Sequence, residues 1–209
     1  MQSRRNLRCR LRAARRALSG RRRRCAETAI ARRIKRLPVY RRAGSLAVYL
    51  SFDGEVDLSA LMLQASAAGK TLYLPFINGR RGAGMHFIRF RPGDPVRRNR
   101  FGILQPNPNR TCRIQPSRID LILMPLVGFD VMGTRLGMGG GYYDRCFASL
   151  ATRGILRHRF VGVAFECQKA ILIERENWDV PVSVVVTEAG VYRSVRNPRS
   201  AFRVNEETK

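Results

Sequence analysis

The chain has 209 residues, enough for one medium-sized α/β domain with a substantial buried core. No apolar run approaches the roughly eighteen residues that a membrane span needs. No apolar segment follows the arginine-rich N-terminus either, so we expect a soluble, cytoplasmic protein without a signal peptide. Its five cysteines are scattered and form no Cys-x-x-Cys pair. This argues against disulfides and a zinc site and predicts reduced, mostly buried thiols.

The net charge of +25 is concentrated near the N-terminus. Residues 1–42 hold 17 Lys and Arg against one acidic residue, Glu27, which gives this segment a net charge of +16. Such a segment could bind nucleic acid through counterion release, but Arg outnumbers Lys 36 to 4, a bias that a G+C-rich genome produces by itself. We favour a field that attracts small polyanions. The alternative is a basic nucleic-acid-binding protein that retains a nucleotide-binding α/β core.

Two basic helices are predicted at the start of the chain. Apolar residues recur at helical spacing from Ser3 to Ser19, and a second helix is predicted over Arg21–Arg36, ending before Pro38. Most arginines of these helices are expected on solvated faces. Arg4 and Arg8, one turn apart, are the exceptions.

The rest of the chain alternates between strands and helices. Strands are predicted over Ser45–Phe52, Thr71–Ile77, Met85–Phe90, Ile119–Phe129, Phe160–Glu166 and Val182–Val186, and helices over Leu58–Ala68 and Tyr142–Ala151. Near-continuous apolar strands are typical of a largely parallel sheet with helices on both faces. We therefore expect one three-layer α/β domain over residues 1–209, with a long connection over Arg91–Arg118 and a flexible tail over 193–209.

The segment Arg135–Arg145 holds four glycines in five positions, between a predicted strand and a predicted helix. A folded chain keeps such a run where the backbone turns sharply or closely approaches a ligand, and a helix N-terminus binds phosphate. Arg135 precedes the glycines and Asp144 follows them, so a cation for phosphate and a carboxylate for metal flank the loop. The segment matches neither the Walker loop nor the dinucleotide fingerprint. The alternative is a glycine-rich surface turn.

A second candidate lies after the strand Ser45–Phe52, where Asp53-Gly54-Glu55 follow. Ligands of open α/β sheets bind at the carboxyl ends of the strands. Glu55 is therefore a candidate ligand contact, and the alternative is a carboxylate that only favours the start of a helix.

Four motifs together carry a family resemblance: Leu-Gly-Met-Gly-Gly-Gly-Tyr-Tyr-Asp-Arg within Arg135–Arg145, the preceding Pro125–Asp130, Tyr49–Glu55, and Trp178-Asp179 with Val186–Glu188. Together they resemble the 5-formyltetrahydrofolate cyclo-ligase family, also called methenyltetrahydrofolate synthetase, and the resemblance runs from the first helix to about Tyr192. The resemblance implies an ATP- and Mg²⁺-dependent ligase. Such an enzyme converts 5-formyltetrahydrofolate to 5,10-methenyltetrahydrofolate and releases ADP and phosphate: ATP phosphorylates the formyl oxygen, N10 attacks the activated carbon, and phosphate leaves as the ring closes.

The resemblance also implies roles for individual residues. ATP contacts are implied at Arg4, Arg8, Arg135, Leu136, Gly137, Met138, Gly139, Gly140, Gly141, Tyr142 and Tyr143. Folate contacts are implied at Leu50, Glu55, Met138, Gly139, Gly140, Gly141 and Tyr142, and Mg²⁺ contacts at Asp144 and Asp179. Arg135, Tyr142 and Tyr143 are the implied catalytic residues, and the alternative for the two tyrosines is packing alone. The family often has lysine where Arg4 stands. We expect a monomer acting on 5-formyltetrahydrofolate, with or without a polyglutamate tail.

Overall fold

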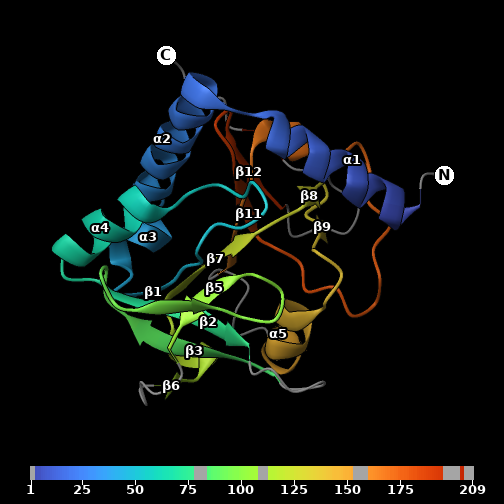
Figure 1. Ribbon diagram of the computed structural model, residues 1–209. Coiled ribbons are helices and arrows are strands. Elements are labelled where there is room, and N and C mark those ends of the chain that lie inside the picture. Colours follow the sequence, from blue (N-terminus) through green and yellow to red (C-terminus); the bar gives the residue numbers. More distant parts are fainter. Residues whose placement is uncertain (1–2, 78–83, 108–112, 153–159, 195–202, 205–209) are drawn as a thin grey trace.

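A central β-sheet with helices on both faces forms the body of the computed structural model, which describes residues 3–77, 84–107, 113–152, 160–194 and 203–204 (Figure 1). The sheet has nine strands in the order β13-β12-β11-β10-β7-β1-β2-β3-β6. The helices are α1 (Arg4–Ala17), α2 (Gly20–Arg36), α3 (Pro38–Arg42), α4 (Ser59–Ala67) and α5 (Tyr142–Thr152). The predicted three-layer α/β architecture is confirmed.

The middle of the sheet is parallel and its edges are antiparallel. The parallel strands are β11 (Val184–Val186), β10 (Phe160–Val163), β7 (Leu121–Pro125), β1 (Ser45–Ala47) and β2 (Thr71–Ile77). The antiparallel strands are β3 (Met85–Phe90) and β6 (Arg113–Ile114) at one edge, and β12 (Val191–Arg193) and β13 (Arg203–Val204) at the other. The edges are antiparallel because a short connection, such as that between β11 and β12, can join only antiparallel neighbours.

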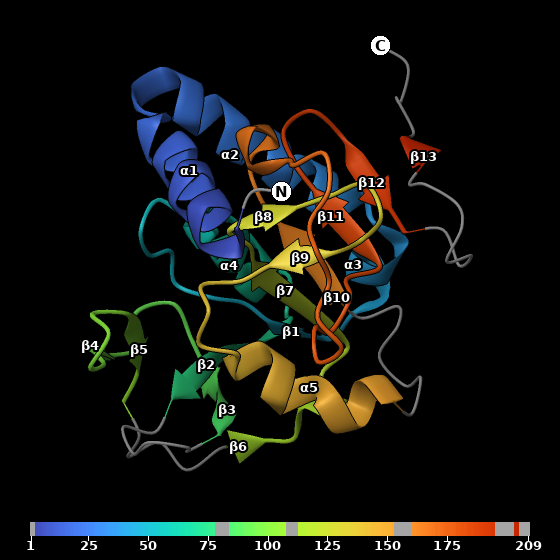
Figure 2. The same cartoon turned by 90° about the vertical axis from the view of Figure 1, so that its right-hand side faces the viewer.

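Two apolar clusters cover the two faces of the sheet. On one face, Ile30 and Ile34 of α2 and Leu61 of α4 pack against the central strands. On the other face, Phe147 of α5 packs against Phe160 at a ring distance of 4.7 Å. The helix α1 belongs to neither layer: its Leu7 and Leu11 join a third cluster with loop residues beyond the sheet. In Figure 2, α1 lies beside β8 (Gly128–Phe129) and β9 (Arg135–Leu136) rather than flat on the sheet.

Several predicted segments differ from the observed structure. The strand expected over Phe160–Glu166 ends at Val163, and the strand expected over Val182–Val186 begins at Val184. The strand expected over Ser45–Phe52 ends at Ala47, because the chain then turns away toward residues 53–54. The strand expected over Ile119–Phe129 is two strands, β7 and β8 (Gly128–Phe129), and β8 pairs with β9 (Arg135–Leu136) in a small separate sheet. The long connection contains β4 (Val96–Arg98) and β5 (Leu104–Pro106), which pair with each other, as well as β6 and a 3₁₀ turn at Pro116–Arg118.

The cysteine prediction is right about the thiols and wrong about burial. Within the described residues, Cys9, Cys25 and Cys167 are free and exposed, and Cys146 is free and half-buried. Cys112 lies outside the described residues, as do most residues of the predicted tail. Over the part of the chain that the structure describes, no helix is both long enough and apolar enough to cross a membrane.

Candidate active site

The glycine loop, residues 137–141, joins β9 to the first turn of α5 at the carboxyl edge of the sheet. Gly139 and Gly141 have φ values of +96° and +61°, a left-handed conformation that glycine adopts readily and side chains oppose. A β-carbon at Gly141 would also lie 2.8 Å from Nη1 of Arg145. The loop therefore requires glycine at these two positions for its own shape.

Two arginines, one from α1 and one from α5, donate hydrogen bonds to the backbone of the loop. Arg8 of α1 donates from Nε to the Gly137 carbonyl oxygen over 3.0 Å, and Arg145 of α5 donates to the Gly140 carbonyl oxygen over 2.8 Å. Burial and the charge of Arg4 lower the pKa of Arg8. The structure thus brings Arg8 to the loop, as the resemblance implies, and adds Arg145, which sequence reasoning did not single out.

The predicted cation and one predicted metal ligand form an ion pair beneath the loop. Arg135 is only 5 % exposed, its Nη2 pairs with Oδ1 of Asp144, and its Nε donates to the Val180 carbonyl oxygen over 2.7 Å. The Val180 N–H donates to the same Oδ1 over 3.0 Å. Burial lowers the pKa of Arg135, and the charge of Asp144 opposes that shift. Leu136 beside it is fully buried in the apolar cluster of α1, so it offers a ligand only its backbone.

The second predicted metal ligand, Asp179, is paired with the helix α1. Arg4 donates to Oδ2 and Oδ1 of Asp179 over 2.9 and 3.4 Å, and the Glu176 N–H donates to Oδ2 over 3.0 Å. Arg4 is therefore placed on a predicted metal ligand and not directly on the glycine loop. No group of three or more His, Cys, Asp or Glu side chains that could hold a metal occurs in the described ranges.

The carboxylate that is predicted to contact the folate, that of Glu55, is buried. Glu55 is 9 % exposed, and the Phe52 N–H donates to its Oε2 over 3.1 Å. Burial raises the pKa of Glu55 from 4.5 to about 7, against the charge of Arg15, whose Nη2 lies 3.9 Å from Oε1. Leu50, before this turn, is half-buried. A buried carboxylate with so few donors can accept hydrogen bonds from a bound ligand.

Three tyrosines lie around this region. The Tyr142 hydroxyl accepts from Nη2 of Arg100 over 3.2 Å, and its ring meets that of Phe101 edge-on at 5.9 Å, so it faces the β4–β5 hairpin. Tyr143 faces inward: burial and the charge of Glu55 raise the pKa of its hydroxyl. Both rings pack against the core, as the packing alternative expects. Tyr49 is 3 % exposed, and its hydroxyl has no hydrogen-bond partner among the described residues.

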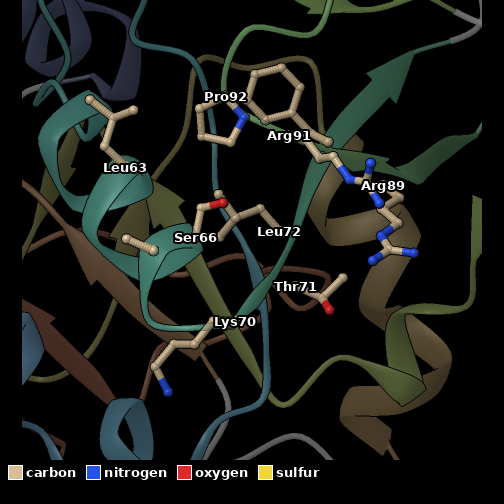
Figure 3. Close-up of a pocket in the computed structure, with 11 residues that line it drawn as sticks. Leu63, Ser66, Lys70, Thr71, Leu72, Arg89, Arg91 and Pro92 are labelled. Carbon is tan, nitrogen blue, oxygen red and sulfur yellow. The ribbon is translucent and has the colours of Figure 1, made fainter.

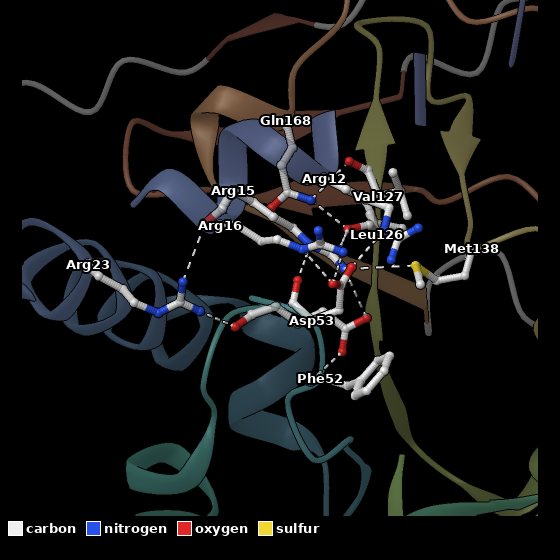
Figure 4. A network of polar contacts seen from close by, with 11 residues as sticks. Arg12, Arg15, Arg16, Arg23, Phe52, Asp53, Leu126, Val127, Met138 and Gln168 are labelled. Atoms are coloured by element: carbon white, nitrogen blue, oxygen red, sulfur yellow. Dashed lines mark hydrogen bonds and ion pairs between the residues drawn. The ribbon is translucent and has the colours of Figure 1, made fainter. Parts of the chain in front are cut away.

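Sequence reasoning missed Arg15 and Asp53. Arg15 was expected on a solvated face but is fully buried, with Nη1 donating to the Leu126 carbonyl oxygen over 3.0 Å and Nη2 to Oδ2 of Asp53 over 2.9 Å (Figure 4). Arg12 and Arg16 also pair with Asp53. The signal was present in the spacing, because Arg15 follows Leu7 and Leu11 at intervals of four and so shares their buried helix face.

A separate hollow of about 570 Å³ lies at the opposite end of β2. Its lining comes from α4, the start of β2 and the end of β3, and includes Leu63, Lys70, Thr71, Arg89 and Pro92 (Figure 3). It contains none of the predicted site residues. The candidate active site is therefore the carboxyl edge of the sheet and not this hollow.

A mostly parallel sheet, a glycine loop that opens a helix, and arginines and carboxylates gathered at one edge define an α/β protein with a candidate anion-binding site. The comparisons specify the class further. Residues 1–188 match the model of the 5-formyltetrahydrofolate cyclo-ligase family. The chain belongs to this family of enzymes.

Individual relatives agree with this assignment. The chain is 34 % identical to a 5-formyltetrahydrofolate cyclo-ligase of Haemophilus influenzae, covering 87 % of this chain and 95 % of the relative, and 38 % identical to that of Escherichia coli K12, covering 72 % and 81 %. The NMR structure of Aquifex aeolicus 5,10-methenyltetrahydrofolate synthetase superimposes with a TM-score of 0.76 at 32 % identity, covering 98 % and 99 % of the two chains. These relatives give no support to the nucleic-acid-binding alternative.

Proposed function

We propose that the chain is an ATP- and Mg²⁺-dependent 5-formyltetrahydrofolate cyclo-ligase that forms 5,10-methenyltetrahydrofolate, ADP and phosphate. The observation that carries the nucleotide part is the glycine loop, two of whose residues have left-handed φ and whose backbone is held by Arg8 and Arg145. Phosphoryl transfer asks mainly for positioning and charge neutralisation. The glycine loop lies at a helix N-terminus and is contacted by the guanidinium groups of Arg8 and Arg145, so it can supply both positioning and positive charge.

In this proposal the loop Gly137–Gly141 and Arg8 bind the ATP phosphates. Arg135 is buried and already held by Val180 and Asp144, so it contributes a fixed positive charge beneath the loop. A fixed charge costs no reorganisation as negative charge develops on the transferred group. Tyr142 and Tyr143 border the nucleotide at the start of α5 in this proposal, where the charge of Glu55 acts on Tyr143 and Tyr142 contacts the β4–β5 hairpin.

Glu55 and Leu50 bind the folate in this proposal. The Glu55 carboxylate accepts hydrogen bonds from the N–H groups of the pterin, and Leu50 contributes apolar contact beside it. The Tyr49 hydroxyl, buried without a partner among the described residues, is a further group that a folate could satisfy. Met138 lies between the two proposed regions, because it belongs to the glycine loop and its Sδ lies 3.8 Å from Nη2 of Arg15, which itself lies 3.9 Å from Oε1 of Glu55.

The fit for Mg²⁺ differs between the two predicted carboxylates. Within the described residues, the hydrogen bonds of Asp144 fall on Oδ1, which leaves Oδ2 for a cation. Both oxygens of Asp179 are bonded to Arg4, so Asp179 reaches a cation only after Arg4 moves, or through water. Carboxylate oxygens together with phosphates suit Mg²⁺, which when bound would neutralise phosphate charge. We therefore assign Asp144 as the main protein ligand and Asp179 as a weaker one.

The test is an absorbance assay for the methenyl chromophore with 5-formyltetrahydrofolate as substrate. We expect product only when both ATP and Mg²⁺ are present, with one ADP formed per methenyl group. Product formation without ATP, or none with all components present, would refute the proposal. Monomeric state and cytoplasmic location remain predictions.

A further inference from the structure

Asp53 gathers three arginines from one helix. Nε of Arg12 lies 2.7 Å from Oδ2, Nη2 of Arg15 lies 2.9 Å from Oδ2, and Nε of Arg16 lies 2.6 Å from Oδ1 (Figure 4). The Asp53 side chain is 8 % exposed and that of Arg15 is fully buried. A buried charge requires a counter-charge, so Asp53 is the anchor of α1 on this part of the molecule.

The backbone conformation at Asp53 fixes the position of the Glu55 carboxylate, which is proposed to bind the folate. Asp53 has a φ of +53° and Gly54 a φ of +79°, and Asp53 is the only non-glycine residue with positive φ in the described ranges. The Glu55 N–H closes the turn on the Phe52 carbonyl oxygen over 3.0 Å, while the Phe52 N–H donates to the Glu55 side chain over 3.1 Å. The position of the Glu55 carboxylate therefore depends on the turn that Asp53 forms.

The same helix reaches the glycine loop. Arg8 donates to Gly137, and Arg15 contacts both Asp53 and the sulfur of Met138. The helix α1 has 14 residues and is about 20 Å long, so it spans the distance between the two binding regions as one rigid element. It docks through few apolar side chains, chiefly Leu7 and Leu11.

The positive charge of α1 is only partly offset when no nucleotide is bound, because two carboxylates, Asp53 and Asp179, pair with its arginines. The helix has no acidic residue in its first turn and carries Arg4, Arg5, Arg8, Arg10, Arg12, Arg15 and Arg16, and it faces a loop already held by Arg145. Like charges close to one another repel. Asp53 offsets this repulsion at Arg12, Arg15 and Arg16, and Asp179 offsets it at Arg4, whereas a polyphosphate on the loop would offset it at Arg8.

We propose that Asp53 is a positioning residue that couples nucleotide binding to folate binding through the docking of α1. A bound polyphosphate favours docked α1, docked α1 holds the Asp53 turn, and the turn presents Glu55 to the folate. Because coupling between two sites is reciprocal, folate raises the affinity for nucleotide by the same factor. This inference rests on the proposed function, since it takes the loop as the ATP site and Glu55 as the folate site.

The test uses Asp53→Asn, which keeps the volume of the side chain and its tolerance of positive φ while removing the charge. Calorimetry would measure the Kd of a non-hydrolysable ATP analogue with Mg²⁺, with and without saturating 5-formyltetrahydrofolate. In the parent enzyme we expect folate to lower this Kd about tenfold, within the usual range of coupling between sites. In Asp53→Asn we expect the ratio of the Kd without folate to the Kd with folate to fall to about one.

Two further variants keep the test sound if Asp53→Asn does not fold. Arg12→Gln combined with Arg16→Gln removes two partners of Asp53 that are not fully buried, and should reduce the ratio to less than half of the parent value. Arg10→Gln, at an exposed position of the same helix, removes one positive charge and should leave the ratio unchanged. A merely structural role of Asp53 would lower the melting temperature and leave the ratio unchanged.

The outcomes separate this inference from the proposed function. A parent enzyme that forms no methenyl product contradicts the proposed function. If the parent enzyme turns over but its Kd ratio is one, the coupling alone is contradicted. The same conclusion follows if the ratio of the parent is kept both in Asp53→Asn and in the Arg12 and Arg16 variant.

Discussion

Arg4 holds both carboxylate oxygens of Asp179, over 2.9 and 3.4 Å, so two residues implied for different ligands bond to each other. The nucleotide contact and the metal contact are therefore not both available at once. Either Arg4 transfers to phosphate as a cation reaches Asp179, or Asp179 keeps Arg4 and contributes to the metal through water. Asp144 has no such conflict on Oδ2, and this difference gives the first prediction.

Asp144→Asn should lower the turnover number about a hundredfold or more, because it removes a metal-neutralising charge and little volume. Asp179→Asn should lower it by less, because its oxygens are engaged with Arg4. Steady-state rates over a range of Mg²⁺ concentrations check both variants, and melting temperatures check that the loss of charge beside buried Arg135 has not unfolded the protein. Near-normal turnover of Asp144→Asn at every Mg²⁺ concentration would contradict the metal assignment.

Gly141→Ala should weaken ATP binding about tenfold or more. An alanine there must adopt a φ near +61° and place its β-carbon 2.8 Å from Arg145, and left-handed conformation alone costs about 1–2 kcal/mol. Gly84→Ala is the control, because Gly84 lies outside the loop, has no positive φ, and its β-carbon would have no atom within 4 Å. It should keep the ATP affinity within about threefold, as for an unstrained surface change. Equal effects of the two variants would argue against a requirement for left-handed backbone.

The buried Glu55 should make stability depend on pH. Its pKa is raised from 4.5 to about 7, so between these values the folded protein holds a proton that the unfolded chain has released. Stability then falls as pH rises from about 4.5 through about 7, by up to about 3 kcal/mol. Glu55→Gln should remove this component, which denaturant unfolding at pH 5 and pH 8 can measure. An unchanged difference between the two pH values would show that Glu55 titrates normally.

Tyr49→Phe should stabilise the free enzyme while weakening folate binding. An unsatisfied buried hydroxyl costs about 1–3 kcal/mol, and the hydroxyl of Tyr49 lacks a partner among the described residues. We expect a rise in melting temperature of a few degrees together with a several-fold higher KM for 5-formyltetrahydrofolate. Tyr40→Phe offers a control, because Tyr40 is buried at α3, away from the glycine loop. Lower stability of Tyr49→Phe would mean that the hydroxyl already has a partner.

The sequence predicted those parts of the fold that depend on local pattern. The bounds of β2 and β3 were predicted correctly because β2 is a mostly apolar run, β3 alternates between apolar and polar residues, and turn-forming residues follow both. The end of β1 at Ala47 could not be predicted, because Tyr49 and Phe52 favour a strand whether or not a neighbouring strand pairs with them. The same limit applies to the site: the glycine loop and the position of Arg15 on the apolar face of α1 are visible in the sequence, but the pairing of Arg15 with Asp53, 38 residues away, is not.

The arginines of α1 provide the last prediction, with controls that the structure revises. Arg8→Ala should weaken ATP binding by about 1.5–3 kcal/mol, the range for a charged hydrogen bond. Arg12 and Arg16 cannot serve as solvated controls, because both pair with Asp53. Arg5 and Arg10 lie exposed on the same helix, and Arg5→Ala and Arg10→Ala should each stay within about 0.5 kcal/mol of the parent. The measurement is ATP affinity of these variants at low and moderate salt. Equal small losses at Arg5, Arg8 and Arg10 that vanish with added salt would mean that α1 only attracts the nucleotide through its diffuse field.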